Sequence, residues 1–327
     1  MKKIHLMLIV ILLLLVIAYI VATFAIKNTT YAFPNSVNFT LGVCTHGNES
    51  SELYALKHGI RYFRTDISNT PEQIKLLYYE HTLGANYLGI LDYSTLPGGI
   101  GNKNWNLSTW NASVEEAVAN YPWINTWEIW NEPYVSNFET GFMNGSAYNY
   151  YLIIKSASTI IKEHEPNATI VCFGGAPIGS SNIFYWYAKV WSYGAAKYCD
   201  AISIHAYPQY AGLMNSNEIN EWNQRLLAYE ELTQKPVWIT EIGMPASSRL
   251  LTGFSPSLQN EFMLQSFDLL NSMRFVKRVY WYDLWGLSDG AEENDFGLLN
   301  LSNPFLEPKP AWYTFMHFYN LSTHEIK

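Results

Sequence analysis

The segment Trp127-Glu128-Ile129-Trp130-Asn131-Glu132-Pro133 is an apolar, strand-like run that ends in a glutamate where a loop begins. The segment Pro236-Val237-Trp238-Ile239-Thr240-Glu241-Ile242-Gly243 repeats this arrangement further along the chain. Strands of a parallel sheet that is covered on both faces have such nearly continuous apolar sequences. Both segments therefore predict buried parallel strands, each with a glutamate at its C-terminal end.

Outward from these two segments, strand-like and helix-like runs alternate eight times. We expect strands at residues 40–45, 60–66, 87–93, 126–131, 168–174, 200–206, 236–241 and 278–285. We expect the longer helices at about residues 146–164, 181–197, 217–234, 256–274 and 309–321. This alternation predicts an α/β fold, the (β/α)8 TIM barrel. The alternative, an open doubly wound sheet, would require a glycine-rich phosphate loop after an early strand, and the sequence has none.

Two helices have recognisable start signals. Thr70-Pro71-Glu72-Gln73 and Ser113-Val114-Glu115-Glu116 have the form of capping boxes, the first with proline at the first helical position. Gly84 stands where the first of these helices should end.

The N-terminus carries an apolar run at residues 5–26, preceded by Lys2 and Lys3 and long enough to span a bilayer. It predicts one apolar helix before the barrel. Residues 1–27 would be either an uncleaved signal anchor or a signal peptide, because the small residues Ala22 and Ala25 would permit cleavage. In both cases the remainder, residues 28–327, is exported. We therefore expect the protein on the extracellular face, either anchored to the membrane through this helix or secreted.

Glycosylation sequons are consistent with export, and they begin at Asn28, Asn38, Asn48, Asn106, Asn111, Asn144, Asn167, Asn300 and Asn320. An asparagine-rich composition would be the alternative explanation.

The net charge is −8, and beyond the N-terminus there is no cluster of lysine and arginine, which argues against nucleic acid as a partner. Aromatic residues make up 16% of the chain and suit either sugar faces or core packing.

The three cysteines, Cys44, Cys172 and Cys199, lack the spacing of a metal site, and we expect neither a metal nor another cofactor. Cys44 and Cys172 fall in expected strands, where we interpret them as small buried residues. One disulfide could form, and the sequence leaves its pairing open.

Chemistry in (β/α)8 barrels takes place at the C-terminal ends of the strands. Seven polar or aromatic residues should lie there: Arg64, Asn131, Glu132, His205, Tyr207, Glu241 and Trp285. Two carboxylates held a few ångströms apart are the basic requirement for cleaving a glycosidic bond. Taken singly, Glu132 could be a helix-start residue and Glu241 a solvated loop residue. Their matched contexts make a catalytic pair the better interpretation.

These motifs resemble those of the clan A glycoside hydrolases, which are (β/α)8 barrels with Asn-Glu after the fourth strand and a glutamate after the seventh. Asn131-Glu132 and Glu241 fit that pattern. His205-Ala206-Tyr207 resembles the sixth strand of family 5, and residues 127–133 are also typical of family 39, a close second. Family 5 usually has a histidine near the end of strand three, where this chain has Asp92-Tyr93-Ser94. The resemblance covers roughly residues 40–320.

The resemblance implies that residues 28–327 are the catalytic domain of an O-glycosyl hydrolase, a retaining, endoglucanase-like β-glycosidase acting on oligo- or polysaccharides. Glu241 would be the nucleophile and Glu132 the acid/base, while Asn131 would bind the sugar 2-hydroxyl. Four further residues would complete the substrate site: Tyr207 as a hydrogen-bond donor to the nucleophile, Arg64 as the cation that keeps Glu241 ionised, Trp285 as the floor of the subsite, and His205.

The physical chemistry agrees with these roles. A retaining reaction needs one carboxylate ionised and the other protonated at the same pH, and a cation beside one of them decides which stays charged. Arg64 is the only arginine at the predicted rim. As alternatives, Arg64 could pair with Asp66, and His205 and Trp285 could serve core packing. We interpret Glu128, which shares strand parity with Glu132, as a buried structural carboxylate.

Two other functions are compatible with the same barrel. A catalytically silent carbohydrate-binding surface protein could keep the fold, although the presence of both glutamates argues against a decayed site. A transglycosylase would differ only in the acceptor that receives the sugar. The sequence distinguishes neither the sugar and linkage nor endo from exo action, and it predicts no oligomeric state.

Overall fold

The structure is a computed structural model that describes residues 33–135, 141–179, 181–208, 214–246, 255–286, 295–300 and 306–323. Ser36–Lys327 form one compact unit. The apolar helix expected at residues 5–26 lies outside the described residues. Among the residues that are described, no helix combines the length and apolarity needed to cross a membrane.

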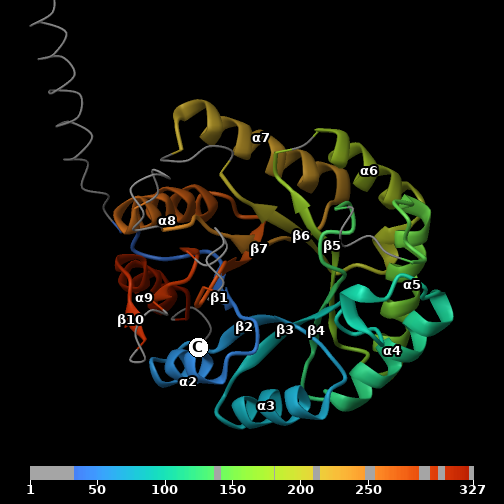
Figure 1. Cartoon of the computed structure of the whole chain (residues 1–327). Helices are drawn as coiled ribbons and strands as arrows, with labels where there is room; N and C mark the ends of the chain where they lie inside the picture. The colour runs from blue at the N-terminus through green and yellow to red at the C-terminus, as the bar shows by residue number, and fades with distance from the viewer. Residues whose placement is uncertain are drawn as a thin grey trace, which may run out of the picture. The chain divides into compact units, whose positions relative to one another are not determined.

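Eight parallel strands close into a barrel in sequence order, with the last strand paired to the first (Figure 1). This confirms the predicted (β/α)8 barrel. The strands are β1 (Thr40–Cys44), β2 (Tyr62–Asp66), β3 (Asn86–Leu91), β4 (Thr126–Ile129), β5 (Thr169–Pro177), β6 (Ala201–Ala206), β7 (Val237–Ile242) and β8 (Val276–Trp281). β8 ends four residues before the predicted boundary at Trp285, so the segment after Trp281 belongs to the rim of the barrel rather than to a strand.

Helices surround the ring of strands (Figure 1). They are α2 (Glu49–Lys57), α3 (Pro71–Thr82), α4 (Leu107–Asn120), α5 (Ala147–His164), α6 (Ser181–Ser192), α7 (Ser216–Thr233), α8 (Pro256–Asn271) and α9 (Pro310–Thr323), with short 3-10 turns η1 (Gly99–Gly101) and η2 (Ala195–Lys197). A small antiparallel pair, β9 (Leu299–Asn300) and β10 (Glu307–Pro308), follows β8.

The start of α3 is as predicted, but its cap is different. The helix begins at Pro71, and Gly84 follows its end with a left-handed φ of 97°. The Thr70 side chain makes no capping hydrogen bond. Instead, the Gln73 Oε1 accepts a hydrogen bond of 2.6 Å from the Ser68 backbone N–H, so the glutamine fixes the approach to the helix rather than closing a capping box.

The predicted start of α4 at Ser113 is wrong. The helix begins at Leu107, and the side chain of Asn106 caps it by accepting a hydrogen bond from the Thr109 N–H. Trp110, in the additional turn, is completely buried. Burial of this indole on the core side gives the first turn its stability, a tertiary effect that outweighs the local capping signal.

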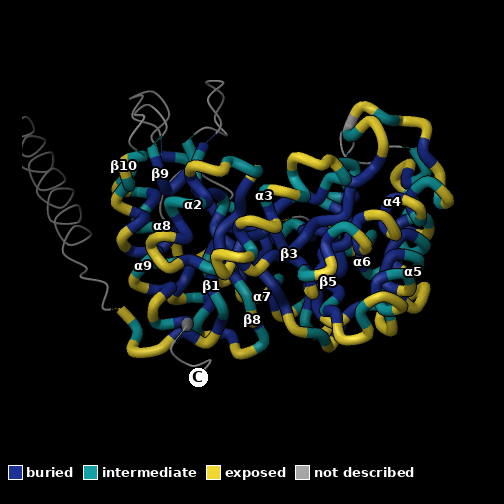
Figure 2. The backbone as a smooth tube through the Cα atoms, turned by 90° about the horizontal axis from the view of Figure 1, so that it is seen from below, coloured by how far each residue is buried: buried dark blue, intermediate teal, exposed yellow. Residues whose placement is uncertain are grey.

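The hydrophobic core has two parts. The larger part lies between the strands and the surrounding helices, and a smaller one fills the inside of the barrel with Cys44, Leu88, Val171, Ala201, Trp238 and Tyr280. Buried segments accordingly run through the centre of Figure 2, and exposed ones lie on the outside. Gly42 makes room for this filling, because a Cβ there would lie 2.6 Å from the Tyr280 ring.

The structure assigns the cysteines. Cys172 of β5 and Cys199, just before β6, form a disulfide, and Cys44 is a buried free thiol. The interpretation of Cys172 as a buried small residue is correct in its burial but missed the bond. The bond ties two neighbouring strands across 27 positions of sequence, including α6 and η2.

Replacing both bonded cysteines, in Cys172→Ser/Cys199→Ser, should lower the free energy of unfolding by about 3 kcal/mol, because the crosslink restricts the unfolded chain. Thermal unfolding with and without a reductant measures this. Reductant should lower the melting midpoint of the wild type and leave that of the double variant unchanged. Equal midpoints for the oxidised wild type and the variant would contradict the prediction.

Candidate active site

Arg64, on β2, lies inside the barrel and contacts two carboxylates, those of Glu128 and Glu241. Its side chain is 3% exposed. Its Nε donates to the Glu128 Oε2 at 2.6 Å, its Nη1 to the Glu241 Oε1 at 2.6 Å, and its Nη2 to the Asn131 Oδ1 at 3.0 Å. The alternative pairing with Asp66 does not occur; the structure pairs Asp66 with His46 instead.

Glu128 holds the Arg64 side chain in place through a buried ion pair. It is fully buried on β4, and besides Arg64 it accepts hydrogen bonds from the hydroxyls of Ser203 on β6 and Thr240 on β7. This agrees with its interpretation as a structural carboxylate. Because an ion pair is stable in a dry interior only when further hydrogen bonds satisfy its oxygens, the three donors together make this charge tolerable.

Glu241, near the end of β7, is held by donors on both oxygens. Arg64 contacts its Oε1, and the Tyr207 hydroxyl donates to its Oε2 at 2.5 Å. Burial alone would raise the pKa of Glu241, but the charges of His205 and Arg64 and the hydrogen bonds from Tyr207 and Arg64 outweigh it and lower that pKa. Burial and the negative charge of Glu241 raise the pKa of Tyr207 well above its usual value, so the phenol stays a donor. Glu241 is thus the ionised carboxylate.

Glu132 follows β4 in a left-handed backbone conformation, with φ at 46°. Its N–H donates to the Gly174 carbonyl of β5 at 2.6 Å, and its Oε1 lies 2.9 Å from the His205 Nδ1. Gly174 and Gly175 make this turn possible. A Cβ on Gly174 would meet the Trp130 carbonyl oxygen at 2.5 Å, and one on Gly175 would meet the His205 ring at 2.2 Å.

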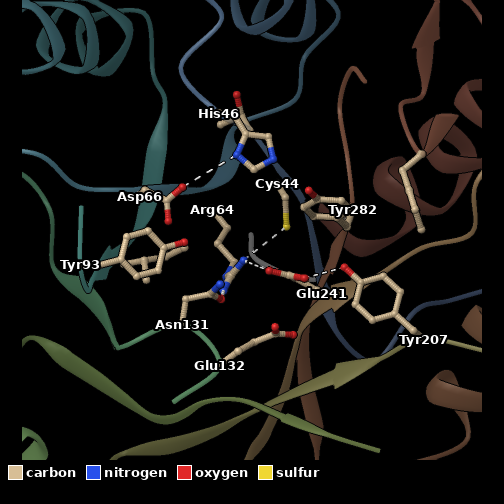
Figure 3. A pocket seen from close by; sticks show the side chains of 13 residues that line it. Cys44, His46, Arg64, Asp66, Tyr93, Asn131, Glu132, Tyr207, Glu241 and Tyr282 are labelled. Atoms are coloured by element: carbon tan, nitrogen blue, oxygen red, sulfur yellow. Dashed lines mark hydrogen bonds and ion pairs between the residues drawn. The ribbon is translucent and has the colours of Figure 1, made fainter. Parts of the chain in front are cut away.

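The two glutamates open onto one pocket of about 470 Å³ (Figure 3). One carboxylate oxygen from each, together with a His205 ring nitrogen, lie within 4.8 Å of one another. Glu132 is the more accessible, with 21% of its side chain exposed against 10% for Glu241. Glu241, whose two oxygens both accept hydrogen bonds, therefore lies opposite the more accessible Glu132.

Five of the seven residues predicted at the rim line this pocket: Arg64, Asn131, Glu132, Tyr207 and Glu241. His205 lies behind the two glutamates, 2.9 Å from Glu132 and 3.4 Å from Glu241. It is buried but not a packing residue, because its imidazole bridges both carboxylates. Trp285 is not among the lining residues; it packs against the outer core and pairs with Leu299 through a β-bridge.

Sequence reasoning missed several lining residues, notably His46, Asp66, Tyr93, Tyr282 and Phe296. His46 lies between two carboxylates, with its Nδ1 3.8 Å from Asp66 and its Nε2 3.7 Å from Asp283. Burial would lower the pKa of His46, but the hydrogen bond and charge of Asp66, with the charge of Asp283, raise it to about 9. The signal for His46 was its position two residues after β1, a strand end for which no rim residue was predicted.

Glu132, His205 and Glu241 are close enough to act as ligands of a metal ion. Arg64 argues against that use, because its guanidinium lies 2.6 Å from Glu241 and would repel a cation bound there. The same guanidinium favours an ionised carboxylate acting as a nucleophile.

Comparison with known proteins identifies the family. A profile of the glycosyl hydrolase catalytic core matches residues 93–313, more than half of the chain. The chain therefore belongs to this glycosyl hydrolase family. No curated protein matches it in sequence.

Solved structures share the fold at low sequence identity. A family 39 glycoside hydrolase from Bacteroides cellulosilyticus WH2 is 20% identical with a TM-score of 0.64, over 88% of this chain and 65% of that one. A monomeric β-xylosidase from Caulobacter crescentus CB15 is 15% identical with a TM-score of 0.63, over 85% and 67%. A β-glucosidase from Thermotoga maritima is 12% identical with a TM-score of 0.62, over 89% and 99%.

The chain spans less than two thirds of the family 39 structure. Family 39, one of the two families that the sequence resembles, is thus represented among the proteins of similar fold.

Removing one partner of the buried Arg64–Glu128 pair should strongly destabilise the protein. Glu128→Ala should lower the free energy of unfolding by about 3–5 kcal/mol, because it leaves a buried guanidinium short of one charge partner. Glu128→Gln, which keeps the shape and an acceptor, should cost less. The control is Glu115→Ala, which removes an exposed partner of His164 and should change stability by no more than about 0.5 kcal/mol. Denaturant unfolding measures all three, and a Glu128→Ala variant as stable as the control would contradict the assignment.

Proposed function

We propose that this protein is a retaining glycoside hydrolase that cleaves β-linked glycans by double displacement, with Glu241 as nucleophile and Glu132 as acid/base. The observation that carries the proposal is the asymmetry of the pair. Arg64 and Tyr207 occupy both oxygens of Glu241 and keep it ionised, whereas Glu132 has neither contact. One oxygen of Glu132 lies within 4.8 Å of one oxygen of Glu241, which suits the close carboxylates of retaining enzymes better than the wider spacing of inverting ones.

In the first step, an oxygen of Glu241 forms a bond to the anomeric carbon, and the bond from that carbon to the leaving-group oxygen breaks. Glu132 gives its proton to that oxygen. The new glycosyl ester removes the negative charge of Glu241. Arg64 remains paired with Glu128, so the guanidinium keeps its position while the nucleophile reacts.

In the second step, Glu132 takes a proton from a water molecule, whose oxygen bonds to the anomeric carbon. The ester bond breaks and Glu241 is charged again. His205 contacts both carboxylates and can stabilise the negative charge as it passes from one glutamate to the other.

The pocket favours a sugar without a charge. Its cations are already paired, Arg64 with Glu128 and Glu241, and His46 with Asp66. A uronate carboxylate would find no unpaired cation among the described lining residues. Asn131, Asp66 and Tyr93 offer hydrogen-bonding groups for hydroxyls, and the half-buried rings of Tyr282 and Phe296 offer apolar faces.

We place the enzyme outside the cell. The apolar segment at residues 5–26 motivates this. The Cys172–Cys199 disulfide supports it independently, because such bonds persist mainly in oxidising compartments. Two sequon asparagines, Asn144 and Asn167, are exposed and lie in turns.

A screen of β-linked glucans, mannans, xylans and aryl β-glycosides should identify a substrate and reveal whether endoglucanase-like action applies. On an activated aryl glycoside, Glu132→Ala should accumulate the glycosyl intermediate, and azide should speed its turnover and give a β-azide. Azide should rescue Glu241→Ala with formation of an α-azide, because the anion then attacks from the vacated face. NMR of the products assigns both anomers.

Near-wild-type turnover by both variants would contradict the mechanism. Cleavage of nothing in the screen would instead favour a carbohydrate-binding role, and transfer of the sugar to a second glycan in preference to water would identify a transglycosylase.

A further inference from the structure

A buried pair of carboxylates outside the pocket contacts the segment that carries His46. The Oε1 of Glu52, on α2, accepts a hydrogen bond from the Thr45 hydroxyl and another of 3.2 Å from the Gly47 N–H. These two residues flank His46 on either side. Glu52 is 1% exposed, so it fixes the loop from within the protein and not from solvent. His46 itself lines the pocket between Asp66 and Asp283.

The second carboxylate is Glu80, on α3. It is completely buried, and its Oε2 accepts a hydrogen bond of 2.5 Å from the Tyr87 hydroxyl. The Glu52 Oε2 and the Glu80 Oε1 are also buried, and neither has a donor among the described residues. Burial and the neighbouring Glu52 raise the pKa of Glu80 to about 9. A single proton on Glu80, donated to Glu52, satisfies both remaining oxygens and removes one of two adjacent buried charges.

We propose that Glu52 and Glu80 share one proton, and that this acid pair is the positioning element that holds the Thr45–Gly47 segment, and with it His46, at the wall of the pocket. The effect of this pair on glycoside cleavage rests on the proposed function, whereas its effect on the position of the Thr45–Gly47 segment does not. Neither glutamate touches the pocket, so both are positioning residues.

The pair should respond to alkaline pH. The titratable groups that act on Glu80 are Glu52 and Glu49 of α2 and Tyr87 of β3. Because the folded state holds its proton more tightly than the unfolded chain, the stabilisation is fully present below the ordinary pKa of a glutamate. It falls as pH rises toward about 9. Above that pH two facing carboxylates repel, and Glu52 moves away with the Gly47 hydrogen bond.

Glu80→Gln separates this effect from general alkaline damage, because its amide donates to Glu52 at every pH. The first measurement is hydrogen exchange of the Gly47 amide by NMR in the wild type and in Glu80→Gln, between pH 7 and pH 10. Exchange should be equal at pH 7. Above pH 9 the wild type should exchange about tenfold faster, the effect of losing about one hydrogen bond. Equal exchange across the range would overturn the proposal, whether or not the protein has activity.

The second measurement is the pH profile of kcat and KM on a cleaved aryl glycoside. Glu80→Gln should match the wild type at pH 7 and exceed its kcat/KM by about tenfold at pH 10, mainly through KM. In a His46→Ala background the two should not differ at any pH, because no imidazole remains to be positioned. An advantage of Glu80→Gln that persists in that background would show a merely structural role and overturn the proposal.

If Glu80→Gln does not fold, Glu52→Gln serves in its place in both measurements, because it also leaves only one carboxylate in the pair. If the Gly47 amide of Glu80→Gln exchanges more slowly than that of the wild type above pH 9 but the protein cleaves no glycoside, the acid pair is supported and the proposed function is rejected.

Discussion

Arg64 is the constraint on which the site depends. A guanidinium inside a barrel is costly unless every donor finds an acceptor, and several kcal/mol are at stake for each unpaired buried ion. Its partners come from different strands: Glu128 from β4, Asn131 from the loop that follows β4, and Glu241 from β7. The barrel must therefore close with β2, β4 and β7 in one particular relation, or this charge is left unsatisfied. The same contacts that solve the burial problem make Glu241 an ionised group facing a pocket.

Glu128, Glu241 and Glu132 have different roles because their surroundings differ. Glu128 and Glu241 share one arginine, yet Glu128 is fully buried among the Ser203 and Thr240 hydroxyls and faces no solvent, whereas Glu241 reaches the pocket. Glu132 lies on a turn that only the glycines of β5 permit, 2.9 Å from the His205 imidazole. Structural, nucleophilic and acid/base carboxylates thus occupy one small volume, and the positions of the donors assign their roles.

Much of this arrangement follows from the sequence. The apolar runs and their spacing predicted the closed barrel, and strand ends predicted that Arg64, Asn131, Glu132, Tyr207 and Glu241 share one pocket. The contacts that depend on tertiary closure could not be predicted. Gly174 and Gly175 look like ordinary strand residues until the turn at Glu132 and the ring of His205 come against them. His46 and Asp66 follow two neighbouring strands, and the register of β1 against β2, which pairs Cys44 with Arg64, brings them together. Trp285 was expected at the end of β8 and in the substrate site; the strand ends at Trp281, and Trp285 is not among the residues that line the pocket.

The central claim is that Glu241 attacks the anomeric carbon while Glu132 supplies and later removes a proton. The stereochemistry of the first-formed product tests it most directly. Proton NMR of a β-glycoside during cleavage by the wild type, recorded before the sugar mutarotates, distinguishes the two anomers. Double displacement at Glu241 predicts that the β-anomer appears first and the α-anomer only later. An α-anomer as the first product would mean a single inverting displacement by water and would remove Glu241 as nucleophile.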